Sequence, residues 1–473
     1  MVMGSLRQET QVAVIGSGPG GYVAALRLAD LGKEVVLIEE RDRHGGVCLL
    51  EGCIPSKTLI HAVEVKESAL AGAKFGLGCS GTSIDLDKLR DHTNGVVSGL
   101  SGGIGGLLKR RGVTTINGRA RFSSNNSLEI EGGEISGIDF EQCVIATGSS
   151  LNRLPDGMTN KVWSSADALK LERVPESLLV VGGGYIGLEL GLVYQGLGSK
   201  VSVAEFFPRL LPGADTDLVE IMVKSVSNRL DSVMLEAKVR SILAKDEGGF
   251  TVRIEQDGEE QTLHFDQVLV AIGRQPNSDD LGLENTKVVV GDRGAIKTDN
   301  VCRTDEPDIF AIGGVAEGPM LAHKASREAK IAAEVICGHK AEFDNRAIPA
   351  VVYTDPEIAW SGLTEREAAE QNIDVKVGKF PLTALGRART MDRVDGLVKI
   401  ICDPENELIL GMGIVGPHAS ELIAEGTLAI EMGATLEDLV ATIHPHPTLS
   451  EALMEAAEVA QGAAVHIHPP RAK

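Results

Sequence analysis

The chain has 473 residues, 43% of them hydrophobic, which is sequence for about three domains of ~150 residues each and excludes a single small module. Its 67 acidic residues outnumber the 46 Lys and Arg residues, and the net charge of −21 is the wrong sign for binding nucleic acid phosphates, so no nucleic acid partner is expected. There are 55 glycines, only 18 prolines and no collagen-like period. We therefore expect the glycines at tight turns and where the backbone approaches a ligand.

The chain shows no sign of a targeting or membrane segment. Its first ten residues, MVMGSLRQET, contain no apolar run, and the longest apolar stretch, residues 178–194, is interrupted by glycines and by Glu189. We therefore expect a cytoplasmic protein without a membrane partner. Seven cysteines, an odd number, do not indicate a secreted disulfide framework, and only Cys48 and Cys53 lie close together.

One pattern occurs twice: an apolar strand, a glycine-rich turn, a helix and a second strand that ends in an acid. The first copy has strands at 11–15 and 35–39 around a helix at 22–31, and it ends in Glu39. The second has strands from 178 and from 200 around a helix through 197, and it ends in Glu205. The glycines of the second turn follow those of the first by 166 positions: Gly16, Gly18 and Gly21, then Gly182, Gly184 and Gly187.

In such a turn the first glycine allows the tight bend, the second lets backbone N–H groups approach a pyrophosphate, and the third lets the helix pack closely. One copy alone would also fit glycine-rich turns in an ordinary α/β sheet. Two copies with their elements in the same order predict two dinucleotide-binding halves. Strands at 144–148 and 268–274 are expected to close these halves near residues 149 and 277, and an α+β pattern begins near residue 347.

Two other segments carry candidate chemistry. Cys48 and Cys53 follow directly on the first half, and in a regular helix their Cα atoms would be roughly 8.7 Å apart, beyond the about 4.4–6.8 Å that a disulfide spans. A pair here would require a distorted segment and would suit repeated reduction; the alternative is two free buried cysteines. Near the other end, His446 precedes Glu451 by five residues. That carboxylate can orient the imidazole as a general base, although a single His is more often structural.

These residues resemble the pyridine nucleotide–disulfide oxidoreductases and, within that family, the dihydrolipoamide dehydrogenases. The motifs that carry the resemblance extend over nearly the whole chain: 16–18, 48–57, 182–205, 273–277, 320–323, 353–357 and 444–451. The resemblance implies an α/β fold with two Rossmann-like dinucleotide-binding domains, for FAD and NAD, and a C-terminal α+β dimerisation domain. The implied boundaries are 1–149 for the FAD domain with its redox disulfide, 150–277 for the NAD domain, 278–346 for a central segment completing the FAD domain, and 347–473 for the dimerisation domain.

The implied enzyme is a homodimer with active sites at the subunit interface and one FAD per subunit. It oxidises dihydrolipoyl groups on a lipoylated carrier protein or lipoyl domain and reduces NAD⁺ to NADH. A dihydrolipoyl thiolate, its proton taken by His446 of the partner subunit with Glu451 orienting the ring, attacks Cys48 and releases Cys53 as a thiolate against the flavin. Lys57 lies beside the flavin N5 and pairs with Glu189. No metal site is implied, and the residues expected to bind a cofactor are Gly16, Gly18, Gly21, Glu39, Gly46, Lys57, Gly118, Thr147, Gly148, Gly314 and Ala322 for FAD, and Gly182, Gly184, Tyr185, Gly187, Glu205, Val239 and Gly273 for NAD.

Cofactor choice has a physical reason. A carboxylate at Glu205 can accept hydrogen bonds from a ribose 2′-OH and repels a 2′-phosphate, which favours NAD over NADP, although Arg209 stands four residues later. Two positions depart from the family pattern: Val47 stands where Thr usually precedes the first cysteine, and Gly314 stands where Asp usually contacts FAD. Flavin retention is therefore the property that these departures are expected to change.

Three alternatives stay open. Glutathione-type reductases share the cysteine segment, but their preference for NADPH conflicts with Glu205. Mercuric reductase needs a C-terminal cysteine pair, whereas the last cysteine here is Cys402. A flavoprotein-fold subunit that docks a lipoylated carrier and turns over slowly is compatible with Val47 and Gly314. The carrier itself, whether from a 2-oxoacid dehydrogenase complex, the glycine cleavage system or sulfur metabolism, is not specified by the sequence.

Overall fold

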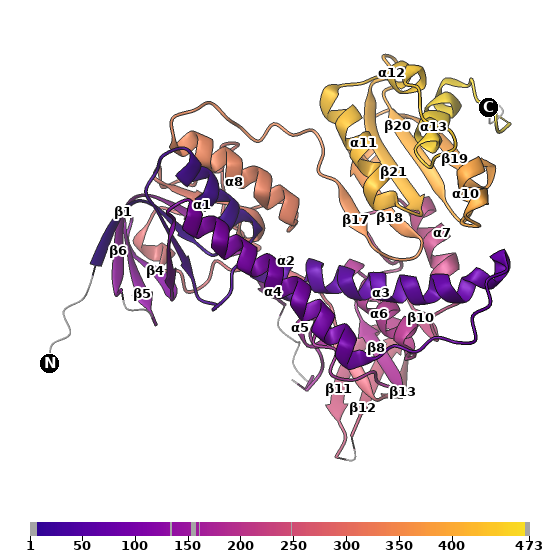
Figure 1. Cartoon of the computed structure of the whole chain (residues 1–473), viewed down its shortest axis with the longest axis horizontal. Helices are drawn as coiled ribbons and strands as arrows, with labels where there is room; N and C mark the ends of the chain where they lie inside the picture. The colour runs from indigo at the N-terminus through magenta and orange to yellow at the C-terminus, as the bar shows by residue number, and fades with distance from the viewer. Residues whose placement is uncertain (1–6, 133–134, 153–157, 160, 247, 469–473) are drawn as a thin grey trace. The chain divides into compact units, whose positions relative to one another are not determined.

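The computed structural model of the chain describes residues 7–132, 135–152, 158–159, 161–246 and 248–468 (Figure 1). The first six residues, where we expect no targeting segment, lie outside the described residues. The chain divides into two compact units, each assembled from three segments. Unit 1 comprises Met1–Leu154, Ser164–Glu172 and Ile272–Asp344, and unit 2 comprises Pro155–Trp163, Arg173–Ala271 and Asn345–Lys473.

A seven-stranded sheet forms the centre of unit 1. Its strands lie in the order β3 (Thr114–Asn117), β2 (Val35–Glu39), β1 (Arg7–Ile15), β6 (Gly137–Ile145), β5 (Ser127–Glu131) and β4 (Arg119–Ser124), and β16 (Ile309–Ala311) also pairs with β6. Strands β3, β2, β1, β6 and β16 run parallel, whereas β5 is antiparallel to both β4 and β6. Val12 and Val14 belong to the core on one face of the sheet, and Ala13 and Ile15 belong to the core on the other. Because both faces are buried, β1 is apolar throughout this stretch and does not alternate.

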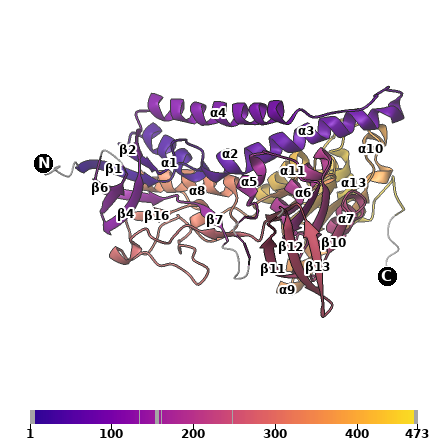
Figure 2. The same cartoon turned by 90° about the horizontal axis from the view of Figure 1, so that it is seen from below.

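Helices cover one face of this sheet. Helix α1 (Pro19–Asp30) packs against α8 (Ala322–Ile336), and α4 (Leu86–Arg110) lies outside α1 (Figure 2). Residues 272–344 return to this unit and supply β16 and α8. The remaining elements of unit 1 are α2 (Gly46–Glu51), α3 (Cys53–Ala71), α5 (Ser165–Leu169), the paired strands β7 (Ser149–Leu151) and β15 (Arg274–Pro276), and the 3-10 turns η1 (Gly72–Phe75), η2 (Leu283–Asn285) and η3 (Gly313–Val315).

Unit 2 contains a second parallel sheet. Its four strands lie in the order β10 (Ser232–Met234), β9 (Lys200–Ala204), β8 (Ser177–Val181) and β14 (Gln267–Val270), and helix α6 (Tyr185–Leu197) connects β8 to β9. Helix α7 (Thr216–Val226) leads from β9 to β10. A three-stranded antiparallel sheet follows, with β11 (Lys238–Ala244), β12 (Phe250–Gln256) and β13 (Glu259–Phe265).

The C-terminal part of unit 2 is an antiparallel sheet with helices. Its strands lie in the order β17 (Ala350–Val352), β18 (Glu357–Gly362), β21 (Ile409–Gly416), β20 (Leu397–Cys402) and β19 (Lys376–Pro381). A Cβ on Gly378 of β19 would lie 2.1 Å from the carbonyl oxygen of Ala456, so only glycine lets the helix at Glu451–Gln461 lie this close. The helical elements are α9 (Glu365–Gln371), η4 (Leu382–Ala384), α10 (Gly386–Thr390), α11 (Ala419–Met432), α12 (Leu436–Ala441) and α13 (Glu451–Gln461).

The predicted fold class is confirmed. Both copies of the strand, turn, helix and strand pattern form parallel βαβ units, and the sequence from about residue 347 forms an antiparallel sheet with helices, which is an α+β arrangement. Among the described residues, no helix combines the length and the hydropathy that a membrane span requires.

Candidate dinucleotide sites and active site

The two glycine turns have the same geometry. Gly16 and Gly182 have φ of +96° and +108°, a conformation that favours glycine. A Cβ on Gly21 would lie 1.7 Å from the Gly16 carbonyl oxygen, and a Cβ on Gly187 would lie 2.1 Å from that of Gly182. The third glycine of each turn therefore allows the helix to pack against the bend.

The helix starts after these turns fit the pyrophosphates of FAD and NAD. Gly18 precedes α1 and Gly184 precedes α6, and among the described residues no side chain caps either helix. The first N–H groups of both helices are thus left without a side-chain acceptor at an end where the helix dipole favours an anion. A Cβ on Gly184 would meet no atom within 4 Å, so the backbone there is open to a ligand.

Glu39 binds the first turn from the end of β2. One carboxylate oxygen accepts the Ser17 N–H at 2.8 Å and the Ser17 hydroxyl at 2.6 Å, and the other accepts the Arg41 N–H at 3.1 Å. The Gly118 N–H donates to the Glu39 carbonyl at 2.9 Å, which brings Gly118, another predicted FAD residue, to this strand end. The carboxylate is buried and is thus held rigidly beside the turn.

Glu205 makes the equivalent contacts in the second copy. Its carboxylate accepts the Gly183 N–H at 2.5 Å and the Phe207 N–H at 2.8 Å. Gly183 and Phe207 stand 166 positions after Ser17 and Arg41, the same spacing as between the two acids. The repeat seen in the sequence therefore extends to individual hydrogen bonds.

The cysteine segment lies against the first turn. A Cβ on Gly46 would lie 2.6 Å from the Gly18 Cα, so the start of α2 contacts that turn directly. The helix breaks at Gly52, and a Cβ there would lie 2.9 Å from the Val47 carbonyl oxygen and 3.3 Å from the Cys48 Cα. The segment therefore departs from one regular helix at Gly52, as a pairing of the two cysteines requires.

The side chains of Cys48 and Cys53 contact each other. A hydrogen bond with the Cys53 side chain, together with burial, raises the pKa of the Cys48 thiol, and the charge of Lys57 opposes this shift. Cys48 is partly buried, whereas Cys53 is exposed at the first position of α3. The two sulfurs therefore lie in different electrostatic surroundings.

Other residues predicted to bind FAD gather at the ends of β6 and β16. Thr147 donates its hydroxyl to the Asn277 carbonyl at 2.7 Å, and the Asn277 amide donates back to the Thr147 carbonyl at 2.9 Å. A Cβ on Gly314 would lie 3.3 Å from the Gly148 carbonyl carbon and 3.4 Å from the Ser149 hydroxyl oxygen. Ala322 is the first residue of α8.

The residues predicted to bind NAD are divided between the units. Tyr185 opens α6 and is exposed, and Val239 lies in β11. Glu189 is buried in α6 and accepts the Tyr353 N–H at 3.0 Å. Gly273 belongs to unit 1, as does Lys57, so the expected pairing of Lys57 with Glu189 stays a prediction.

His446 and Glu451 form the expected pair. The His446 Nδ1 lies 2.8 Å from one Glu451 oxygen, and the other oxygen accepts the Thr448 N–H at 2.7 Å. Burial acts to raise the pKa of Glu451, but these hydrogen bonds outweigh it and hold that pKa below its ordinary value. The His446 side chain is 79% exposed, so its Nε2 is open to a substrate.

Sequence reasoning missed a buried ion pair next to the Gly314 turn. The Lys324 Nζ lies 2.6 Å from Glu328, whose second oxygen accepts the Gly313 N–H at 2.7 Å. Burial raises the pKa of Glu328, and the Lys324 charge acts against that shift. In the sequence, the only sign of this ion pair is that Lys324 and Glu328 are four residues apart, a spacing that is equally common for pairs on exposed helix faces.

Two dinucleotide turns, a dithiol against the first of them and an oriented histidine define an oxidoreductase that exchanges electrons between a disulfide and nucleotide cofactors. The chain belongs to the pyridine nucleotide-disulphide oxidoreductases: that family matches residues 10–329, and its dimerisation domain matches residues 348–457. The predicted resemblance is thereby confirmed, and FAD and NAD(H) are the cofactors of this class.

Similar proteins span the whole chain. It is 45% identical over 473 residues to the dihydrolipoyl dehydrogenase of Haloferax volcanii, covering 98% of this chain and 99% of that one. It is 44% identical over 469 residues to the dihydrolipoyl dehydrogenase of Geobacillus stearothermophilus, covering 99% of both. Among solved structures, LpdA from Mycobacterium tuberculosis has a TM-score of 0.86 at 28% identity, covering 95% of this chain and 99% of LpdA. The HOCl-induced flavoprotein disulfide reductase RclA from Escherichia coli has a TM-score of 0.83 at 29% identity, with coverages of 94% and 98%.

Proposed function

We propose that the protein is a dihydrolipoyl dehydrogenase, which oxidises a dihydrolipoyl group on a carrier protein and reduces NAD⁺ to NADH. Full-length similarity to several dihydrolipoyl dehydrogenases supports the substrate class. The observation that carries the proposal is the contact between Cys48 and Cys53 in a segment folded against the first dinucleotide turn.

The thiol chemistry uses these cysteines as a disulfide. A dihydrolipoyl thiolate attacks the Cys48 Sγ, the bond between Cys48 and Cys53 breaks, and Cys53 leaves as a thiolate. The second dihydrolipoyl sulfur then displaces Cys48 and forms the lipoyl disulfide. Bound FAD supplies the two-electron relay to NAD⁺, so that dithiol and NAD⁺ give disulfide, NADH and one proton.

The surroundings of the two sulfurs support these separate roles. Cys53 stands at the N-terminus of the 19-residue helix α3, whose dipole favours negative charge there, and Lys57 lies one turn further along the same helix. The thiol of Cys48 has a raised pKa. The helix dipole and Lys57 therefore favour negative charge at Cys53, which supports Cys48 as the sulfur that exchanges with substrate.

The His446 and Glu451 pair is the proposed proton acceptor in a homodimer. Glu451 fixes the ring through Nδ1 and leaves Nε2 to take the substrate thiol proton. The family's dimerisation domain supports the homodimer, and we place the active site between its subunits. Leu428, Met432 and Ile443 are 62%, 75% and 96% exposed on one protomer, as apolar residues of a subunit interface would be. The carrier protein and a cytoplasmic location stay predictions.

Spectroscopy and turnover of the purified protein test the proposal. Wild-type protein should carry flavin and reduce lipoamide with NADH. Cys48→Ser should abolish lipoamide turnover but keep long-wavelength absorbance from the Cys53 thiolate beside the flavin. Cys79→Ser is the matched control, because Cys79 is exposed in unit 1 and should leave both signals unchanged. A wild-type flavoprotein that is reduced by NADH but never reduces lipoamide would exclude this substrate.

A further inference from the structure

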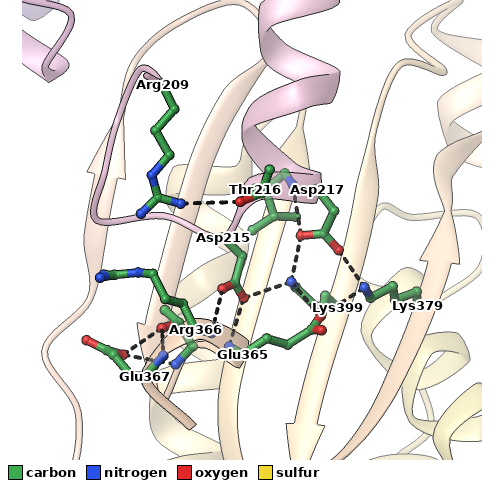
Figure 3. Close-up of polar contacts among 11 residues, drawn as sticks. Arg209, Asp215, Thr216, Asp217, Glu365, Arg366, Glu367, Lys379 and Lys399 are labelled. Carbon is green, nitrogen blue, oxygen red and sulfur yellow. Dashed lines mark hydrogen bonds and ion pairs between the residues drawn. The ribbon is translucent and has the colours of Figure 1, made fainter. Parts of the chain in front are cut away.

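A buried lysine in unit 2 takes no part in the chemistry above. Lys399 lies in β20 with its side chain only 1% exposed, and three carboxylates surround its Nζ (Figure 3). The distances are 2.7 Å to Asp215, 2.6 Å to Asp217 and 2.9 Å to Glu365. Although burial disfavours the charge, hydrogen bonds to these three groups raise the pKa of Lys399 above its ordinary value. The three carboxylates therefore stabilise the charged ammonium.

A second lysine closes the network from its exposed side. The Lys379 Nζ lies 2.7 Å from Asp217 and 2.8 Å from Glu365 (Figure 3). Oxygens of the three acids come within 4.8 Å of one another, as ligands of a cation would, but the Lys399 ammonium already bonds to all three. Removing Lys399 would leave its buried partner Asp215 without its counter-ion, which is far costlier than losing a surface pair.

Asp215 connects this lysine to the starts of two helices, α7 and α9. It directly precedes α7, and its carboxylate also accepts the N–H groups of Glu365 at 3.1 Å and Arg366 at 3.3 Å, at the start of α9. The residue is buried. Through Asp215, Lys399 in the C-terminal sheet therefore fixes the end of the segment that leads from β9 to α7.

That segment, residues 206–214, packs on the second dinucleotide turn. The Leu211 N–H donates to the Gly183 carbonyl at 3.2 Å, and a Cβ on Gly183 would lie 2.3 Å from the Leu210 side chain. A Cβ on Gly213 would lie 3.2 Å from the Trp360 ring of β18. Glu205 directly precedes the segment and Asp215 directly follows it, so the acid of the dinucleotide site stands at one end and the residue held by Lys399 at the other.

We propose that Lys399 is a positioning residue for the second dinucleotide site. By holding Asp215 it fixes residues 206–214 against Gly183, and so sets the place of Glu205 for the adenosine end of the dinucleotide. A site built on a parallel sheet is thus completed by a charge from a neighbouring antiparallel sheet. The inference rests on the proposed function insofar as this dinucleotide is NAD(H).

Direct binding measurements on the FAD-loaded protein test the role of Lys399. Lys399→Met should raise the Kd for NADH at least 10-fold, while flavin content and flavin reduction by dihydrolipoamide stay within twofold of wild type. Lys399→Arg, which keeps the charge, should recover part of the affinity. The matched control is Lys376→Met on the neighbouring strand β19, because Lys376 is partly exposed and pairs with Glu407, at 2.9 Å, outside this network. This control should leave the Kd within twofold.

A milder variant tests the same network with less risk of unfolding the protein. Glu365→Gln removes one charge from the partly exposed rim and should raise the Kd for NADH about 2- to 5-fold. Variants that unfold at lower urea concentration but bind NADH like wild type would show that Lys399 is structural only, and would overturn the proposal. Wild-type protein that binds neither NADH nor NADPH would instead refute the proposed function together with this inference.

Discussion

The equivalent acids Glu39 and Glu205 allow an internally controlled experiment. Each carboxylate accepts two backbone N–H groups, one from its own glycine turn and one from two residues further along its own chain segment. Glu→Gln at either position keeps the side-chain size but replaces one acceptor oxygen with an NH₂ group, which cannot accept a hydrogen bond. The two variants therefore make the same chemical change at two different dinucleotide sites.

The observed hydrogen bonds allow the expected losses of stability and of cofactor affinity to be estimated. One N–H group in each variant loses its acceptor in a buried place, which costs about 1–3 kcal/mol of unfolding free energy. A lost hydrogen bond from a ribose hydroxyl to a charged acceptor costs about 1.5–3 kcal/mol. That is about a 10- to 150-fold rise in the dissociation constant of the affected dinucleotide. Stability should fall similarly in both variants, whereas the lost affinity should differ between the cofactors.

Two assays separate the effects. Glu205→Gln should weaken NADH binding, measured by titration of the FAD-loaded protein, and leave flavin retention unchanged. Glu39→Gln should release FAD at lower urea concentration and leave the Kd for NADH of the remaining holoenzyme near wild type. If both variants weaken both cofactors equally, the acids act through general stability and the assignment of one acid to each cofactor is wrong.

Three further predictions concern the other site residues. His446→Gln should slow dihydrolipoamide oxidation by about 10²–10⁴-fold, the range for a positioned base, without slowing flavin reduction by NADH. The control His444→Gln loses the 2.7 Å contact with Glu425, so it should lower stability but leave the rate of dihydrolipoamide oxidation unchanged. The pKa of Glu451 is depressed in the folded state, so the ionised carboxylate stabilises the protein at pH values above its ordinary pKa of 4.5, and this stabilisation is lost as the pH falls through the pKa of the folded state. The unfolding free energies of wild type and Glu451→Gln should therefore converge in acid. Gly314→Asp should improve FAD retention during urea titration, and Gly314→Ala, which adds only the crowding near Gly148, should not; equal effects of the two would show that the carboxylate contributes nothing.

The repeated βαβ pattern could be predicted from the sequence because its signals are local. The expected strand at 35–39 is β2 itself, Val35–Glu39, and the strand expected from residue 200 begins there as β9. Apolar runs buried on both faces, glycines at fixed spacing and a terminal acid all lie within about 25 residues of one another. In these segments the secondary structure predicted from the local sequence is therefore the one that the fold adopts.

Other features depended on contacts that the pattern does not encode. If residues 48–53 formed a regular helix, the two cysteines could not pair. The structure shows that the helix breaks at Gly52, whose backbone lies close to Val47 and Cys48. Lys399 interrupts the apolar run of β20, but its partners come from residues 34 to 184 positions away. A single charge in a buried strand predicts that a partner exists, not which residue provides it.

The hydrogen bonds of Arg209 also explain why this residue does not favour NADP over NAD. An arginine four residues after the strand-end acid could receive a 2′-phosphate, but here its guanidinium donates to the Pro212 carbonyl at 2.7 Å and to the Thr216 hydroxyl at 3.2 Å. The first bond lies within residues 206–214 and the second links that segment to the start of α7, so Arg209 is used to shape the segment. Glu205, with about four acceptor positions and two of them taken by backbone N–H groups, still has capacity for the ribose hydroxyls, while its charge repels a phosphate. The preference for NAD(H) therefore follows from where each charge is already bound, and a wild-type protein with higher affinity for NADPH would contradict it.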